Sequence, residues 1–180
     1  MEVESGGAIA MSEISIESYK SPYGEMLLGA YEGRLVLCDW RYRKMRTAID
    51  QRIQREVGAD YVEEGNETIE LAKSQLSEYF ERERRNFELP LLFVGTDFQK
   101  CVWESLLKVP YGRTATYSDL AEDMGNRESV RAVANANGAN ALSIFVPCHR
   151  IVGSDGKLVG YAGGLNAKKK LLELEFDLFS

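Results

Sequence analysis

Cys148 and His149 are the residues in this chain best suited to chemistry. The thiol stands directly before the only histidine among 180 residues, inside the run Val146-Pro147-Cys148-His149-Arg150-Ile151-Val152. The thiolate is the reactive form of cysteine, and an imidazole can generate or stabilise it. Most cysteines are small buried hydrophobic residues, but the pairing with the lone histidine, a proline and an arginine favours a nucleophile here.

The β-branched residues and the proline around this pair predict an extended backbone over residues 146–152. Neighbouring side chains on a strand point to opposite faces. The ring of His149 should therefore not contact the sulfur of Cys148 unless the chain turns sharply between them. We expect a water relay or a wider network to link the two groups.

A carboxylate on the last predicted helix, about residues 166–176, is a candidate member of that network. Leu165, Leu172 and Glu175 follow i, i+7, i+10 spacing, which puts Glu175 on or beside the apolar stripe. His149 is its obvious partner, because no other acid lies near that histidine in the sequence. A surface salt bridge from Glu175 to Lys168 or a neighbour is the alternative.

The other two cysteines are predicted to be core residues. Cys38 shares a face with Val36 and Trp40 if residues 34–40 form a strand, and Cys101 falls on a helical face with Phe98, Val102 and Leu106. Three widely spaced cysteines do not indicate a disulfide framework, and they favour a reducing compartment. Cys148 is therefore the candidate reagent.

The first half of the chain predicts a small sheet with helices. Short alternating runs from Ser12 to about Trp40, broken at Ser21-Pro22 and Glu32-Gly33, indicate antiparallel hairpins. Residues 43–57 carry a thin helical stripe. Asn66 is expected to cap a helix that continues to about Arg82. Residues 87–94 follow as an extended segment or strand.

The second half predicts mostly helix. Thr96 should cap a helix over 97–108, and a turn over 110–112 ends it. Two short helices follow, one from Thr116 or Ser118 to Gly125 and one over 127–137. Two such helices around a turn containing glycine suggest a helix-turn-helix, although many helical hairpins in enzymes have the same pattern.

Small residues mark the second of these short helices and the segment after Cys148. The helix carries Ser129 and three alanines beside Arg131. They allow close approach of another backbone or tight core packing, but an unpaired buried arginine is costly and argues against a wholly buried helix. Glycines within 153–164 indicate either close approach of a flat ligand or an ordinary flexible loop.

Charge is unevenly distributed along the chain, whose net charge is −6. Residues 1–96 carry 12 basic and 18 acidic side chains, whereas residues 99–170 carry 10 and 6. A nucleic-acid surface, if the chain has one, should lie in the second half and make few phosphate contacts. No apolar run is long enough for a membrane helix, and no signal peptide is apparent.

Residues 147–150, Pro-Cys-His-Arg, resemble the active-site motif of the O6-alkylguanine-DNA alkyltransferases, also called methylated-DNA–protein-cysteine methyltransferases. The likeness spans roughly residues 96–176, with a weaker match in element order before it. It implies an α+β fold in which a small N-terminal antiparallel sheet with helices, ribonuclease-H-like, precedes a mostly helical domain with a winged-helix-like helix-turn-helix. The expected divisions are a disordered extension or tag remnant over 1–11, a structural domain over 12–95 and a DNA-binding, alkyl-transfer domain over 96–180.

The resemblance also implies roles for individual residues. Cys148 would attack the alkyl carbon on O6 of a flipped guanine, with O4 of thymine as a second candidate position, once only and irreversibly. Glu175 would orient His149, which acts through a water, and Tyr117 would donate to the guanine. Arg131 would fill the space left in the duplex, and the other implied DNA contacts are Ser118, Ser129, Ala132, Ser154 and Tyr117. The implied pocket comprises Asn140, which braces the loop, and Tyr161, Ala162, Gly163 and the backbone of Ile151. Arg150 would hold the loop.

The implied partner is double-stranded DNA containing O6-alkylguanine, which the protein would approach from the minor groove. The protein is expected to be a monomer that neither binds a membrane nor requires a protein partner. No cofactor or metal is expected: some members carry zinc in the first half, but here that half offers only Cys38 and no histidine. The expected location is cytoplasmic, at the nucleoid in a bacterium, or nuclear in a eukaryote. One departure from the family is Asn140-Ala141 where many members have Asn-Pro.

Two other functions compete with alkyl transfer. A non-catalytic protein could bind alkylated bases and recruit repair factors, but such proteins have another residue at the position of Cys148. A helix-turn-helix transcription factor is disfavoured by the near-neutral second half and by the single glycine-rich, pocket-like loop. The sequence therefore favours the enzyme.

Overall fold

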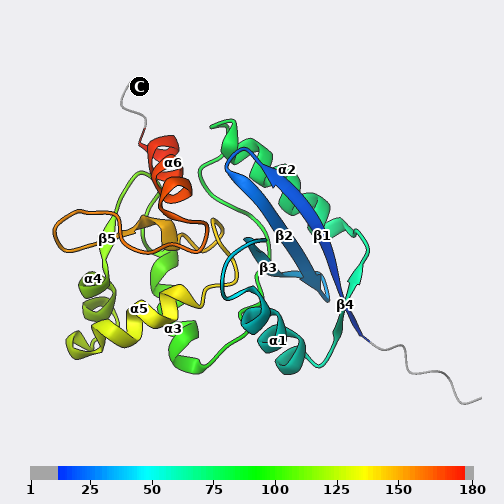
Figure 1. The fold of residues 1–180 in the computed structure, drawn as a ribbon, viewed down its shortest axis with the longest axis horizontal. Coiled ribbons are helices and arrows are strands. Elements are labelled where there is room, and N and C mark those ends of the chain that lie inside the picture. The colour runs from blue at the N-terminus through cyan, green and yellow to red at the C-terminus, as the bar shows by residue number, and fades with distance from the viewer. Residues whose placement is uncertain (1–11, 177–180) are drawn as a thin grey trace, which may run out of the picture.

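A four-stranded sheet forms the first half of the protein, as a computed structural model shows (Figure 1). The structure describes residues 12–176, so the extension predicted over 1–11 lies outside the described residues. The strands are β1 (Glu13–Ser21), β2 (Gly24–Tyr31), β3 (Arg34–Trp40) and β4 (Asp60–Glu63), in the order β3-β2-β1-β4. The α+β fold class is confirmed.

The two predicted hairpins are present, because both turns have suitable residues. Glu32 and Gly33 both have positive φ, 49° and 76°, the twist that a two-residue hairpin needs. The antiparallel sheet expected over residues 12–40 is confirmed, and β4, for which no strand was expected, adds to β1 in parallel. A parallel pair requires a crossover of about a dozen residues, and α1 (Arg46–Val57) supplies it.

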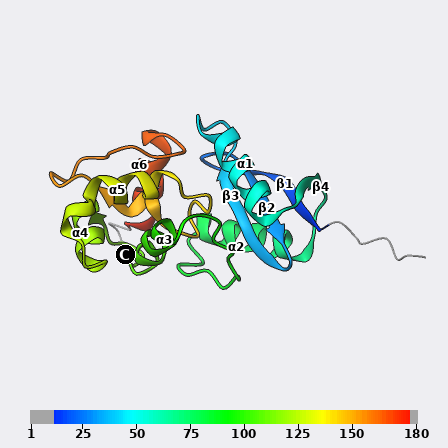
Figure 2. The same ribbon diagram turned by 90° about the horizontal axis from the view of Figure 1, so that it is seen from below.

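Helices cover both faces of this sheet (Figure 2). Helix α1 packs Ile49 and Ile53 against one face, and α2 (Glu67–Phe80) packs an apolar stripe against the other. The side chain of Asn66 accepts a hydrogen bond from Ile69 N at 2.9 Å, which confirms the predicted cap of α2. The last buried residue of this stripe is Tyr79, which points toward the second half of the chain.

The free edge of β3 is covered by two segments from elsewhere in the chain. Leu35 exchanges backbone hydrogen bonds with residues 90–92, and Cys38 does so with residues 141–143. Residues 87–94 are therefore extended, as expected, but contribute only an isolated bridge at Leu91. Covering the edge satisfies backbone groups that would otherwise be open to other chains, and it joins both halves of the protein.

The second half contains α3 (Asp97–Leu107), α4 (Tyr117–Asp123), α5 (Val130–Gly138) and α6 (Leu165–Glu175), with short parallel strands β5 (Ala115–Thr116) and β6 (Ile151–Val152). Thr96 and Thr116 each form a capping box, which fixes the starts of α3 and α4. A 3₁₀ turn over Arg127–Ser129 precedes α5, so α4 and α5 form the predicted helical pair. Among residues 12–176, no helix is long and apolar enough to cross a bilayer.

Cys38 is fully buried, as predicted, but the placement of Cys101 in the core is wrong. The buried stripe of α3 runs through Val102, Trp103 and Leu106, and Cys101 lies on the exposed side. Apolar spacing identified the correct helix but assigned two exposed residues, Phe98 and Cys101, to its buried face.

Candidate active site

The backbone at Cys148 turns sharply, so the extended conformation predicted over 146–152 is wrong. Cys148–Arg150 form one turn of 3₁₀ helix, and only Ile151 and Val152 continue as a strand. The amides of this turn bond locally, Cys148 N to Val146 O at 2.8 Å and Arg150 N to Pro147 O at 3.0 Å. Just before it, Ile144 has a φ of 74°, a strained conformation for a β-branched residue that the surrounding core must enforce.

Asn140 braces this turn and touches the thiol. Its Nδ2 donates to Cys148 Sγ at 3.2 Å and to Val146 O at 3.0 Å, and its Oδ1 accepts from Leu142 N at 2.9 Å. Cys148 is only 4% exposed. Burial raises the pKa of the Cys148 thiol, and the hydrogen bond from Asn140 opposes that rise.

Replacing Asn140 with alanine should slow alkyl transfer near neutral pH by about tenfold, since it removes a hydrogen bond to the developing thiolate. The pKa of Cys148 should rise, so the deficit should shrink as the pH is raised and both thiols ionise. Single-turnover rates measured across a pH series would show this convergence. A deficit that is equal at every pH would indicate that Asn140 has only a structural role.

His149 is connected to Glu175 deep in the protein, which confirms the pairing expected from helical spacing. His149 Nε2 lies 2.7 Å from Glu175 Oε1, and both side chains are buried. A carboxylate only accepts hydrogen bonds, so Nε2 carries the proton. Nδ1 is then the basic nitrogen, and it has no hydrogen-bond partner among the described residues. The structure shows no hydrogen bond between His149 and Cys148 within residues 12–176.

Glu175 accepts from three side chains in all. Tyr79 Oη donates to Oε1 at 2.8 Å, and Arg150 donates to both carboxylate oxygens at 2.9 Å. Burial lowers the pKa of His149 more than Glu175 raises it, so the imidazole is neutral at pH 7. Burial alone would raise the pKa of Glu175, but its hydrogen bonds and charged neighbours lower it to about 2. The hydrogen bond from His149 is the largest of these lowering causes, and the hydrogen bonds and permanent charge of Arg150 add to it.

Arg150 holds the loop, as expected, because it also donates to Val109 O at 2.7 Å. Lys168 does not form the surface salt bridge considered for Glu175. It is fully buried, donates to the carbonyls of Ile151 and Val159, and has a pKa lowered by burial to about 8. The expectation for Ile151 therefore changes: its carbonyl binds Lys168, and Ile151 does not line the cavity described next.

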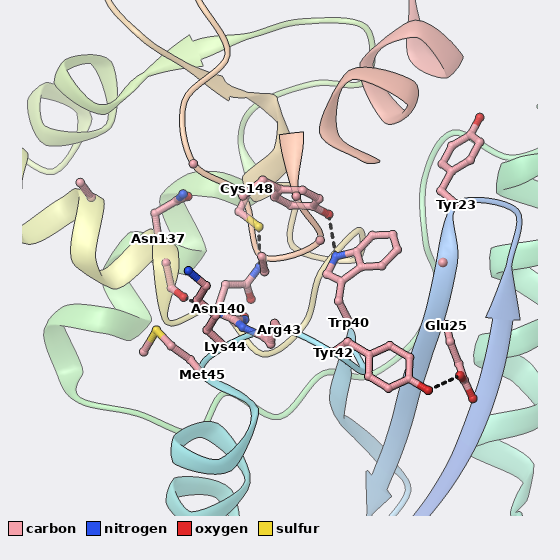
Figure 3. Close-up of a pocket in the computed structure, with 18 of the residues that line it drawn as sticks. Tyr23, Glu25, Trp40, Tyr42, Arg43, Lys44, Met45, Asn137, Asn140 and Cys148 are labelled. Atoms are coloured by element: carbon pink, nitrogen blue, oxygen red, sulfur yellow. Dashed lines mark hydrogen bonds between the residues drawn. The ribbon is translucent and has the colours of Figure 1, made fainter. Parts of the chain in front are cut away.

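A cavity of about 750 Å³ opens at Cys148 between the two halves of the protein (Figure 3). Six of the predicted catalytic and pocket residues line it together: Cys148, Tyr117, Asn140, Tyr161, Ala162 and Gly163. Asn137 and Ala134 of α5 form one side. The opposite side comes from the first half of the chain and includes Tyr23, Trp40 and Tyr42.

Apart from Tyr117, the residues expected to contact DNA lie outside this cavity. Arg131 and Ala132 are exposed on α5, and Ser118 on α4 and Ser154 after β6 are exposed as well. Ser129 is half-buried, with its hydroxyl donating to Asn126 O at 2.7 Å. The structure thus places these side chains on the outer face of the helical pair and the following loop.

Three residues near the site were not anticipated, and Lys168 was considered only as a surface partner of Glu175. The burial of Lys168 could have been expected, because it precedes Glu175 by seven residues and so shares its helical face. Trp40, Arg43 and Tyr79 reach the site from the first half of the chain. Arg43 donates to Asn140 O at 3.1 Å and Gly138 O at 2.6 Å. No local pattern marks such long-range contacts.

Comparisons with known proteins agree along the whole described chain. The family model described as "6-O-methylguanine DNA methyltransferase, ribonuclease-like domain" matches residues 14–93. The model described as "6-O-methylguanine DNA methyltransferase, DNA binding domain" matches residues 97–176. Together the two models cover the sheet and the helical half that carries the cavity.

Similar proteins carry one name. The methylated-DNA–protein-cysteine methyltransferase of Methanosarcina barkeri is 43% identical over 156 residues, 87% of this chain and 93% of that protein. The constitutive enzyme of that name from Bacillus subtilis is 38% identical and covers 85% and 89%. The crystal structure of Mycobacterium tuberculosis OGT in complex with DNA matches with a TM-score of 0.77 and 36% identity, covering 90% and 92%.

Proposed function

Because this chain belongs to the 6-O-methylguanine DNA methyltransferase family, we propose that it repairs DNA by moving an alkyl group from O6 of guanine to Cys148. Its activity is that of a methylated-DNA–protein-cysteine methyltransferase. The observation that carries the role of Cys148 is its position in the cavity, buried, beside a neutral histidine held by a carboxylate. No other described cysteine has such surroundings.

The proposed reaction balances with groups that the protein holds. The thiol proton of Cys148 passes through a water to Nδ1 of His149, and Glu175 stabilises the resulting imidazolium through Nε2. Sγ forms a bond to the alkyl carbon as that carbon's bond to O6 breaks, and the electron pair stays with the guanine. Burial and the nearby Cys148 raise the pKa of Tyr117, so its hydroxyl keeps a proton to donate to the departing base.

The product is a thioether, which water does not hydrolyse, so each molecule acts once. The pathway requires an extruded base, because the carbon on O6 cannot reach a thiol that is only 4% exposed while the guanine is stacked. Arg131 fills the gap in the duplex, and the exposed Ala132 beside it allows close approach to the minor groove. The binding partner is DNA. The protein would therefore act in the compartment that contains the genome.

The test is to incubate the protein with duplex DNA containing O6-methylguanine and to measure intact and peptide masses. We expect one methyl group on the peptide that contains Cys148 and none on the peptides of Cys38 and Cys101. Cys148→Ala should remain unmodified. Repeated turnover by one molecule, or methyl on another residue, would contradict the mechanism. Binding without transfer would instead support a damaged-base-binding protein, which the presence of Cys148 disfavours.

A further inference from the structure

Trp40 lies at the end of β3 in the first half of the chain, yet it forms part of the wall of the Cys148 cavity. Only 4% of its surface is exposed. Its Nε1 donates to Tyr161 Oη at 3.1 Å, and the two rings meet edge to face with centroids 5.9 Å apart. Figure 3 shows the indole of Trp40 to the lower right of Cys148, with this hydrogen bond drawn as a dashed line. The position of Trp40 is therefore tied to the pocket.

Two glycines leave room for the indole, because a side chain at either position would approach it closely. A Cβ added to Gly163 would lie 2.5 and 2.6 Å from indole carbons of Trp40, closer than atoms can approach. A Cβ added to Gly24 would lie 3.2 Å from the far edge of the ring. Gly163 is not among the described glycines with positive φ, so close packing against Trp40, rather than backbone conformation, explains the need for glycine there.

The direction of the transferred group follows from the two sides of the cavity. Asn137 of the helical half lies on one side of Cys148 and Trp40 lies on the other (Figure 3), with Gly163 packed against the indole. In the proposed function, the base arrives from the DNA-binding helices and its first alkyl carbon meets Sγ. Any further atoms of the alkyl group must then extend away from α5, toward the indole.

We propose that Trp40 determines alkyl specificity, by closing the distal side of the pocket so that small groups such as methyl are accepted and bulky groups such as benzyl are excluded. The proposal rests on the proposed function. It assigns a substrate-selecting role to the first half of the chain, which otherwise supports the site through Arg43 and Tyr79. A hydrophobic wall discriminates by steric fit, and such fit changes relative rates by about tenfold or more.

The test compares single-turnover transfer from two duplexes that differ only in O6-methylguanine or O6-benzylguanine. Trp40→Ala should raise the ratio of benzyl to methyl rates by about tenfold or more over the unmodified protein. Trp40→Phe keeps most of the wall and removes the indole N–H, so its ratio should stay near that of the unmodified protein. The ratio of the two rates does not depend on the fraction of active protein. That fraction is measured separately, as the amount of methyl group that Cys148 accepts from excess substrate.

A double-mutant cycle gives an independent reading. Gly163→Ala alone should slow methyl transfer by about tenfold, because its methyl group collides with the indole. In the Trp40→Ala background the same change should have little effect. If Trp40→Ala does not fold, Trp40→Leu replaces it in both experiments, because leucine is smaller than tryptophan and also opens the side of the pocket that the indole closes.

The outcomes separate the two proposals. If the unmodified protein transfers no methyl to Cys148, the proposed function fails. If methyl is transferred but the benzyl-to-methyl ratio of Trp40→Ala stays within about twofold of the original, or Gly163→Ala is equally harmful in both backgrounds, Trp40 is not the wall. A shifted ratio together with rescue of Gly163→Ala supports the assignment.

Discussion

Arg131→Ala is expected to slow methyl transfer from O6-methylguanine in duplex DNA by about 100-fold, because extruding a base costs a few kcal/mol and each 1.4 kcal/mol is tenfold. Arg131 is exposed on α5 and makes no hydrogen bond or ion pair within residues 12–176. The protein therefore loses nothing in folding when the side chain is removed. The decrease in rate should arise in the step in which the guanidinium replaces the extruded nucleotide.

Substrate choice distinguishes this role from simple charge attraction. In a single-stranded oligonucleotide the base is hardly stacked and leaves no unpaired partner, so Arg131→Ala should cost less than about threefold there. Arg127→Ala is the matched control: it removes a nearby exposed arginine that pairs with Glu122 at 2.6 Å. That control should weaken binding to both substrates similarly, as loss of one phosphate contact would. Equal losses for Arg131→Ala on both substrates would contradict a role in base extrusion.

Local chemistry explains which parts of the fold were predictable. Caps at Asn66 and Thr96, the turn at Glu32-Gly33 and the helical spacing that leads to Glu175 each depend on a few neighbouring residues. They appear in the structure as the sequence indicates. The partner of Glu175 was also predictable, because His149 is the only histidine and an apolar stripe had to bury the carboxylate against something.

The errors arise where tertiary contacts override the local pattern. The residues around Cys148 favour a strand, but Asn140 binds the carbonyl of Val146 and the chain closes into a 3₁₀ turn. Cys101 satisfies an apolar spacing but lies at the rim of its stripe. The side chain that decides the turn, Asn140, lies outside the run from which the strand was predicted.

The first half of the chain acts as a scaffold for the chemistry of the second. Asp39 is fully buried and pairs with Arg43 at 3.0 Å and Arg46 at 2.8 Å, which orients Arg43 toward two carbonyls near Asn140. Tyr79 and Trp40 extend the same scaffold to Glu175 and Tyr161. The motif alone therefore points to the proposed nucleophile but not to the groups that hold its surroundings in place.

Glu175→Gln should lower the free energy of unfolding near pH 7 by about 3–5 kcal/mol, because it leaves the buried guanidinium of Arg150 without its countercharge. The amide keeps the shape of the side chain but presents an N–H to one of the donors that the carboxylate accepts. Denaturant unfolding measures the difference. Glu173→Gln is the matched control, since Glu173 lies two residues away, exposed, with a 3.8 Å contact to Lys169. It should change stability by less than about 0.5 kcal/mol.

The pH dependence of this difference tests its electrostatic origin. The pKa of Glu175 is about 2 in the folded protein, below the usual value of 4.5, so the unfolded chain binds its proton first as the pH falls. Its contribution is fully present above about pH 5 and disappears toward pH 2, on the order of 3 kcal/mol in all. The stabilities of the unmodified protein and Glu175→Gln should therefore converge as the pH is lowered. Parallel curves would mean that Glu175 stabilises the fold by packing, and that the charge of Arg150 is satisfied without it.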